Sequence, residues 1–439
     1  NESKNDMYDI DAQQWQILGV STPIIKALKD QQFYQPTPIQ ALTLPPAILG
    51  HRDILGAAET GSGKTLAFGI PIINGILELK NKQSDQETNT ENYMEKPLYA
   101  LILTPTRELA IQIKDHLTKA AKYVDIKVRI AVVLGGMAAV KQERILSKGP
   151  EIVIATPGRL WELIHEIMLF NRYLVIDETD RMLEKGHFQE LQQLLEKINT
   201  NEKRLRERQT FVFSATLTMK LEKIMELVGI KNPKIIDVTK ESGTANLTEC
   251  RIACTIDHKD YYLYYFLKRY TGRTLVFCNS IGCVKRLSTL FGILDCKPLP
   301  LHASMQQRQR LKNLERFQTD ENGLLIATDV AARGLDIPNI EHVIHYQVPR
   351  TSESYVHRSG RTARAEKNGI TVLMMEPSEK QYYSKLCKTL GRNLPMFPVV
   401  DKLLIAVKER VDIAREIDKL ELKCRRDNSQ KEEDEEDSE

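Results

Sequence analysis

A glycine-bearing segment from Ala58 to Thr65 has the residue types that hold nucleotide phosphates. In order, its residues are Ala58, Glu59, Thr60, Gly61, Ser62, Gly63, Lys64 and Thr65. Glycines let backbone N–H groups close around phosphate oxygens, the lysine reaches the β- and γ-phosphates, and the last threonine hydroxyl can ligate Mg²⁺. The apolar pair Ile54–Leu55 precedes the segment and Leu66–Phe68 follows it, which fits a loop between a strand and a helix. The segment predicts a nucleotide site, although alanine stands where the general pattern begins with glycine.

Two adjacent carboxylates, Asp177 and Glu178, follow the apolar run Leu174–Ile176. Acids at the carboxyl end of a buried strand require a cation. We expect Asp177 to hold Mg²⁺ through water, and Glu178 to orient and deprotonate the water that attacks the γ-phosphate. An isolated acidic strand end is usually a solvated turn. Its combination with an upstream phosphate loop favours hydrolysis of a nucleoside triphosphate.

Short apolar runs predict the buried parallel strands that must position these groups. The runs are Ala100–Leu103, Ile152–Ile154, Leu174–Ile176, Phe211–Phe213, Leu275–Phe277 and Leu324–Ile326. Helical patterns such as Arg107–Tyr123 and Phe188–Ile198 lie between them. Strands that alternate with helices predict an α/β fold, in which ligands bind at the carboxyl ends of the strands.

The length of 439 residues predicts two domains, because one core rarely grows so large. The stretch Ile152–Arg159 is echoed by Leu324–Asp329, which suggests that the domains are similar. Residues 80–97 are polar and predict a surface loop, and five apolar positions beyond Pro398 predict an amphipathic helix: Leu404, Val407, Val411, Ala414 and Ile417. That helix docks on the second domain or binds RNA or a partner. The predicted parts are a first domain (1–237), a linker (238–247), a second domain (248–395), a helical extension (396–427) and an acidic disordered tail (428–439).

Composition narrows the class of protein. The chain is 42% hydrophobic and 28% charged, which is typical of α/β proteins and argues against a fibrous or wholly disordered chain. Lys431–Glu439 holds seven acids and one lysine, so the rest of the chain is more basic than the net charge of +3 indicates. An excess of basic residues suits a polyanionic partner or merely aids solubility.

The seven cysteines form no C-x-x-C pair, which fits a reduced compartment and makes a zinc site the less favoured interpretation. No apolar stretch approaches the ~18 residues that span a bilayer, and Asn1–Asp6 lacks signal-peptide character. We therefore expect a protein that is neither secreted nor embedded in a membrane.

Further motifs lie in a fixed order along the chain. In the first half they are Phe33–Gln40, Pro105–Ala110, Gly135–Gly136, Thr156–Arg159 and Ser214–Thr216. In the second half they are Phe277–Ser280, Gln307 with Arg310, Thr328–Asp336 and His357–Arg364. Together with the phosphate loop and the acids, this set resembles the DEAD-box branch of superfamily 2 helicases, over about Trp15 to Pro395.

The resemblance implies two tandem RecA-like domains, each a parallel β-sheet flanked by helices, that form an RNA-stimulated ATPase with ATP and Mg²⁺ bound. It implies that Phe33 stacks on adenine, that Gln40 reads the adenine edge, and that Asp336 contacts the ribose hydroxyl. Arginines, hydroxyls and glycine N–H groups suit RNA phosphates. The implied RNA contacts are Pro105, Thr106, Arg107, Gly135, Gly136, Thr156, Pro157, Gly158, Arg159, Gln307, Arg310 and Thr328.

The last motif implies a catalytic site shared by the two domains. Arg361 and Arg364 correspond to arginine fingers that act on the γ-phosphate, alongside Lys64 and Glu178. Coupling between the ATP and RNA sites is implied for Asp180, Ser214, Thr216 and His357. Only a closed arrangement of the domains would then be catalytic.

Three residues depart from the family pattern: Thr179 replaces alanine, Ser359 replaces isoleucine and Ala363 replaces glycine. The segments His357–Arg364 and Asp180–Phe188 are similar to a nucleolar branch that assists large ribosomal subunit assembly. That similarity implies a monomeric nuclear protein with pre-ribosomal partners. Two alternatives stay open: an ATP-gated RNA clamp or assembly scaffold with slow turnover, and a DNA helicase.

Overall fold

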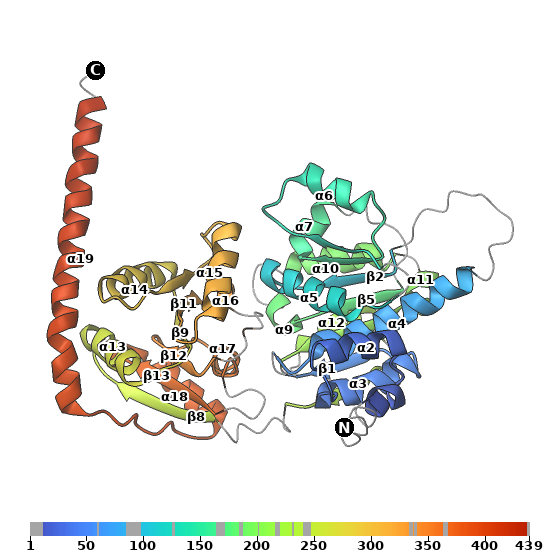
Figure 1. Ribbon diagram of the computed structural model, residues 1–439, viewed down its shortest axis with the longest axis horizontal. Helices are drawn as coiled ribbons and strands as arrows, with labels where there is room; N and C mark the ends of the chain where they lie inside the picture. The colour runs from blue at the N-terminus through green and yellow to red at the C-terminus, as the bar shows by residue number, and fades with distance from the viewer. Residues whose placement is uncertain are drawn as a thin grey trace, which may run out of the picture. The chain divides into compact units, whose positions relative to one another are not determined.

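The computed structural model describes residues 12–58, 61–84, 98–124, 128–163, 172–183, 188–200, 202–215, 220–230, 232–239, 247–332, 337, 340–362 and 368–436. The chain forms two compact units, the first chiefly up to Gly243 and the second chiefly from Thr244 (Figure 1). This division falls inside the segment predicted as a linker, of which 240–246 lie outside the described residues. Of the predicted surface loop, residues 80–84 end helix α4, and 85–97 lie outside the described residues.

The described part of the first unit contains a seven-stranded parallel sheet. The strands are β1 (Ile54–Ala57), β2 (Ala100–Leu103), β3 (Ile130–Val133), β4 (Ile152–Ala155), β5 (Tyr173–Ile176), β6 (Gln209–Ser214) and β7 (Lys234–Asp237). Their order across the sheet is β3-β4-β2-β5-β6-β1-β7, and every neighbouring pair is parallel. This order places the ends of β5, β6 and β1 side by side.

Helices cover both faces of this sheet (Figure 1). They are α2 (Thr22–Asp30), α3 (Pro38–Ile48), α4 (Lys64–Ser84), α5 (Arg107–Ala120), α6 (Ala139–Leu146), α7 (Pro157–Glu162), α9 (Thr179–Met182), α10 (Phe188–Ile198), α11 (Glu202–Glu207) and α12 (Lys220–Val228). Successive strand residues enter two separate apolar clusters: Ile102 packs with Phe68 and Ile113, whereas Leu101 packs with Leu194. Burial on both faces explains why the strands read as continuous apolar runs.

The second unit repeats the topology of the first. Its strands are β8 (Leu247–Ala253), β9 (Thr274–Cys278), β10 (Leu299–Leu301), β11 (Leu324–Thr328), β12 (His342–His345) and β13 (Gly369–Met375). They are ordered β10-β11-β9-β12-β13-β8, which is the order of β1 to β6 in the first sheet. The echoed segments, at β4 and β11, therefore hold equivalent places. The expectation of two similar parallel-sheet domains is confirmed.

The helical elements of the second unit are η1 (Ile256–His258), α13 (Lys259–Arg269), α14 (Ile281–Ile293), α15 (Gln307–Thr319), α16 (Asp329–Ala332), α17 (Ser352–Ser359), η2 (Pro377–Glu379), α18 (Lys380–Leu390) and α19 (Asp401–Glu436). Before α19, the chain pairs with β8, since the Arg251 N–H donates to the Pro395 carbonyl and the Phe397 N–H to the Arg251 carbonyl, each over 2.8 Å.

The C-terminal helix α19 differs from its predicted bounds. It packs on α13 and α14 through residues that include Val411 and Ala414, which confirms docking on the second unit (Figure 1). The prediction of a disordered tail from residue 428 is wrong for 428–436, because the helix continues to Glu436. The lysines and glutamates there are good helix formers, so high charge does not end the helix.

Two further expectations concern membranes and metals. Among the described residues, no helix has both the length and the apolar character needed to cross a bilayer. All seven cysteines are free. Within the described ranges, no group of three or more histidine, cysteine, aspartate or glutamate side chains is arranged to hold a metal.

Two buried histidines on β12 predict an acid-sensitive second unit. Burial lowers the pKa of His342 to about 4, and burial with the nearby Arg358 charge holds the pKa of His345 well below its usual range. The unfolded chain binds these protons near pH 6.5, so the contribution of the two histidines to the free energy of unfolding should be constant above that pH and fall below it. His342 alone should contribute a loss of up to about 3 kcal/mol between pH 6.5 and 4.

Urea unfolding followed by circular dichroism at several pH values would measure this loss. The His342→Gln variant should show a shallower dependence on pH than the parent, whereas His258→Gln, at an exposed position, should not. An unchanged pH dependence in His342→Gln would contradict the assignment.

Candidate nucleotide and nucleic-acid sites

A pocket in the first unit is lined by residues of three helices and of the loops that precede α3 or follow β1 and β5. It lies where β1 and β5 end and where α3, α4 and α5 begin. Its lining consists of Phe33, Gln35, Thr37, Gln40, Gly61, Gly63, Lys64, Thr65, Leu66, Leu109, His116, Asp177 and Glu178. Most residues predicted for nucleotide binding are thus brought together. Ala58 and Ser62 are described but do not line the pocket, and Glu59, Thr60 and Asp336 lie outside the described residues.

The phosphate loop has the backbone that its glycines predict. Gly61 and Gly63 have φ of +84° and +95°, which side chains with a Cβ rarely adopt. A Cβ on Gly63 would also lie 2.5 Å from Nε2 of Gln40. Lys64 begins α4, and its buried Nζ donates to the Ala58 carbonyl over 2.8 Å, which closes the loop.

Ala58 explains how the loop tolerates the missing glycine. Its φ is not positive, so a glycine backbone is not required there. Its side chain is fully buried in the apolar cluster that contains Phe68. The methyl group therefore packs into the core and does not obstruct the pocket.

Gln40 joins α3 to the phosphate loop. Its Oε1 accepts from the Thr37 N–H at 2.9 Å, and its Nε2 donates to the Gly63 carbonyl at 3.1 Å. A primary amide still has one N–H and one acceptor lone pair after these bonds, which suits an adenine edge. Phe33 is 42% exposed and lines the same pocket, so its ring can stack on a base.

The acidic pair occupies a tight turn at the end of β5. Glu178 has φ of +50°, a left-handed conformation that is strained for residues other than glycine. Such strained residues are often found at functional sites. Its N–H donates to Oδ1 of Asp177 over 2.9 Å, and its own Oε2 pairs with Nη1 of Arg181 at 3.0 Å. The ion pair is buried and fixes the carboxylate.

Burial raises the pKa of Asp177 to about 6, since Lys64 only partly offsets the desolvation and Glu178 adds to it. A bound cation would relieve this cost. The Thr65 hydroxyl and the Asp177 carboxylate line one pocket, and such hard oxygen donors suit Mg²⁺. The residues present therefore fit both the nucleotide and the metal.

Two departures from the family pattern are accommodated by hydrogen bonds. The fully buried Thr179 Oγ1 donates toward the carbonyls of Phe213, at 2.9 Å, and Ile176, at 3.2 Å, and so links β6 to β5. The buried Ser359 Oγ lies 3.1 Å from Nε2 of His345. Ala363 lies outside the described residues.

The predicted coupling residues lie close to the acids in the sheet order. Ser214 ends β6, between β5 and β1, and its carbonyl accepts from the Ala58 N–H at 3.0 Å. Asp180 lies in α9, directly after Glu178 and Thr179. Thr216 lies outside the described residues, so its role in coupling stays a prediction.

A second group of predicted residues gathers at the ends of β2, β3 and β4, which are neighbours in the sheet. The guanidinium of Arg107 lies against Gly135 and Gly136, where a Cβ on Gly136 would approach Nη1 to 2.5 Å. Arg159 donates from Nη2 to the carbonyl of Met137 over 3.2 Å. The two arginines are thus held beside one glycine turn, where an anionic backbone could bind.

Helix starts complete this group. Thr106, after Pro105, caps α5, its Oγ1 accepting from the Leu109 N–H, and Thr156 and Pro157 begin α7. A Cβ on Gly158 would lie 2.6 Å from Oε2 of Glu190, so a side chain there would displace that carboxylate. The backbone N–H groups of a helix start favour anions.

In the second unit the predicted residues lie around the ends of β11, β9 and β12. Thr328 ends β11, Gln307 and Arg310 lie on α15, and His357 lies on α17. Arg361 follows α17, is buried, and donates from Nε to the His357 carbonyl at 3.3 Å. Arg364 lies outside the described residues.

Sequence reasoning missed several residues of these sites. Leu109 and His116 line the nucleotide pocket from α5. His116 lies seven residues after Leu109 and three after Ile113, so the three share one helix face. A polar residue on that apolar face is the signal that could have identified this part of the pocket. Arg181, which fixes Glu178, could have been found from its three-residue spacing.

Comparisons with known proteins agree with this geometry. The family model described as DEAD/DEAH box helicase matches residues 37–224, and the helicase conserved C-terminal domain matches 258–366. The chain is 41% identical to human ATP-dependent RNA helicase DDX24, over 94% of this chain and 64% of that protein. It is 40% identical to ATP-dependent RNA helicase mak5 of Schizosaccharomyces pombe, over 96% of this chain and 67% of that protein. It therefore spans about two thirds of the length of these relatives.

The fold is also similar to solved structures. Mss116p bound to ssRNA and AMP-PNP aligns with a TM-score of 0.75 and 28% identity, covering 88% of this chain and 78% of that one. Dbp5 of S. cerevisiae bound to RNA and ADP BeF3 aligns with a TM-score of 0.73, but at 20% identity this likeness concerns the fold alone.

Proposed function

We propose, from the premise that this chain belongs to the DEAD/DEAH box helicase family, that it hydrolyses ATP when RNA is bound and thereby unwinds or remodels RNA locally. The observation that carries the proposal is the single pocket that unites the phosphate loop with Gln40, Asp177 and Glu178. These groups supply adenine selection, phosphate binding and a base for water.

Within this pocket each side chain has a distinct role. Lys64 binds the β- and γ-phosphates, while Thr65 and Asp177 hold Mg²⁺. The metal, when bound, neutralises charge on the phosphates. Glu178, held by its ion pair with Arg181, orients and deprotonates the attacking water.

The RNA backbone binds to the arginines and helix starts at β2, β3 and β4, together with Gln307, Arg310 and Thr328 of the second unit. Support comes from Arg107 and Arg159 beside the turn at Gly136. Contacts to the sugar-phosphate backbone carry no base information, so binding should depend on salt more than on sequence. The RNA bound by Mss116p is consistent with this role.

The second unit supplies Arg361 and Arg364 to the phosphates. Strand β8, which corresponds to β1, is followed by Cys254–His258 in place of a glycine-bearing loop. The second unit therefore cannot bind a nucleotide as the first does, and its part is to complete the site. RNA that binds both units would couple completion of the site to RNA binding.

The cellular role that we propose is large ribosomal subunit assembly in the nucleolus, with pre-ribosomal proteins as partners. Support comes from the sequences of the segments His357–Arg364 and Asp180–Phe188, which are similar to those of the nucleolar branch. RNAs crosslinked to the protein in cells would test this role, and enrichment of messenger RNA without ribosomal RNA would contradict it.

An assay with matched nucleic acids tests the biochemical proposal. ATP hydrolysis should rise with single-stranded RNA and little with DNA of the same sequence, and a short RNA duplex should separate only with hydrolysable ATP. Duplex that stays paired while RNA is retained with a non-hydrolysable analogue would favour the clamp. Equal stimulation by DNA would favour the DNA helicase.

A further inference from the structure

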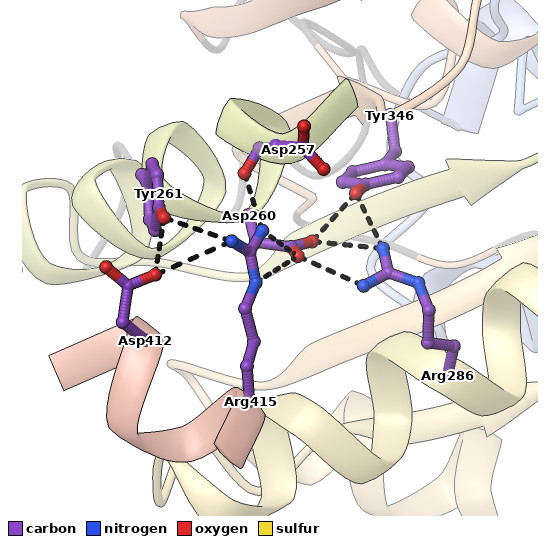
Figure 2. Close-up of polar contacts among 7 residues, drawn as sticks. All are labelled: Asp257, Asp260, Tyr261, Arg286, Tyr346, Asp412 and Arg415. Carbon is purple, nitrogen blue, oxygen red and sulfur yellow. Dashed lines mark hydrogen bonds and ion pairs between the residues drawn. The ribbon is translucent and has the colours of Figure 1, made fainter. Parts of the chain in front are cut away.

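A buried carboxylate in the second unit accepts five hydrogen bonds from three side chains that lie far apart in the sequence. Asp260, on α13, is 1% exposed. Both its oxygens accept from Arg286 of α14 at 3.0 Å, Oδ1 accepts from the Tyr346 hydroxyl at 2.7 Å, and Oδ2 accepts from Nη2 of Arg415 at 2.6 Å (Figure 2). Burial alone would raise the pKa of Asp260, but these bonds outweigh it and hold that pKa below its usual value.

Arg415 brings the C-terminal helix α19 into this cluster. Besides Asp260, its guanidinium donates to the Asp257 carbonyl at 2.6 Å and to the Tyr261 hydroxyl at 3.0 Å, and Tyr261 in turn contacts Asp412 (Figure 2). A planar guanidinium with several fixed partners sets orientation as well as distance. The docked face of α19 is therefore held in one register on α13.

The opposite side of the cluster holds the segment that follows β12. Tyr346 bonds to both Asp260 and Arg286, the latter at 2.7 Å. Its neighbour Gln347 accepts from the Asn279 N–H at 2.8 Å through Oε1. The next N–H, of Val348, donates to Glu379 at 2.8 Å. Every residue of this three-residue segment is thus fixed by a polar contact.

Gln347 and Asn279 in turn hold Arg358 of α17. The Gln347 carbonyl accepts from Nη1 of Arg358 at 3.1 Å, and Asn279 Oδ1 accepts from its Nη2 at 2.7 Å. The Asp329 carboxylate accepts from Nε at 2.6 Å and from Nη2 at 2.7 Å. Arg358 is 1% exposed. It precedes Arg361 by one helical turn, so its position determines where α17 delivers Arg361.

We propose that Arg415 is a positioning residue for Arg361, acting through Asp260, Tyr346 and the segment that binds Arg358. The C-terminal helix then sets the turnover number of RNA-stimulated ATP hydrolysis without touching ATP or RNA. This inference rests on the proposed function, in which Arg361 acts on the γ-phosphate.

Loss of Arg415 should leave the second unit folded. Asp260 keeps its bidentate pair with Arg286, so no buried charge is left without a partner. The cost is looser orientation of Asp260 and Tyr346. Catalysis is sensitive to such looseness, because a displacement of about 1 Å at a reacting group can cost on the order of 10²-fold in rate.

The test compares Arg415→Ala with Arg410→Ala, which removes the same residue type from an exposed position on the same helix. With saturating RNA and ATP, well below the melting temperature, Arg415→Ala should lower kcat by about tenfold. The KM values for RNA and ATP should stay within about twofold of the parent. Arg415→Lys should recover part of kcat, and Arg410→Ala should match the parent.

A second variant, Tyr346→Phe, removes one hydroxyl without altering α19 and should also lower kcat at unchanged KM. It decides the question if Arg415→Ala fails to fold. Parent kcat in Tyr346→Phe, or a lower melting temperature alone in Arg415→Ala, would overturn the inference and leave a purely structural role. A parent protein that RNA does not stimulate would refute the proposed function instead.

Discussion

Replacing Arg361 with alanine is expected to lower RNA-stimulated ATP hydrolysis by about 10³ to 10⁵-fold, or roughly 4–7 kcal/mol of transition-state stabilisation. An arginine finger acts on charge that develops as the γ-phosphoryl group transfers, so its loss reduces kcat much more than substrate binding. Arg361 is buried and hydrogen-bonded to the carbonyl of His357, one turn back on α17. Its guanidinium is therefore already restricted before any ligand binds.

Steady-state ATPase assays with saturating RNA would measure the effect. Arg350→Ala removes an exposed arginine of the same unit and should behave like the parent. Affinity for ATP should change little in Arg361→Ala, because the pocket lies in the first unit. Hydrolysis at the parent rate would show that Arg361 takes no part in the reaction.

Replacing Glu178 with glutamine should lower kcat by about 10² to 10⁴-fold. The amide has the same shape and can still accept a hydrogen bond from Arg181, but it cannot take a proton from water. Asp177 and Lys64 are unchanged, so ATP should still bind. The variant should therefore hold ATP and RNA together and release RNA slowly.

RNA release measured beside ATP hydrolysis would test this expectation, with Glu196→Gln as the exposed control on α10. Slow release in Glu178→Gln and rapid release in the parent would favour a remodelling enzyme that turns over. Equally slow release from both proteins would favour the clamp.

The sequence by itself determined the chemistry of the nucleotide site and the class of fold. When a strand precedes them, Gly61, Gly63 and Lys64 indicate phosphate binding. Together with such a loop, the paired acids at the end of β5 indicate a cation site. Strands buried on both faces leave a continuous apolar signal, so β2 and α10 were predicted at their observed bounds. Such information is local and can be read without the fold.

The sequence does not predict β10 and β12. Strand β10 has three residues with a proline at its centre, and β12 has a histidine at each end, so neither forms a continuous apolar run. The end of α19 also differs from the prediction: an acidic run indicates disorder, whereas its lysines and glutamates favour a helix that continues to Glu436. In both cases the local sequence permits more than one structure.

Only the tertiary structure decided which distant side chains act together. The sequence did not show that Ala58 packs into the core, that the Thr179 hydroxyl links β5 to β6, or that Arg415 shares one carboxylate with Arg286. Asp260 and Arg415 are 155 residues apart in the chain. Contacts at such separations depend on strand order and helix docking, which bring partners together through the summed packing of the whole unit and leave no mark in the local pattern.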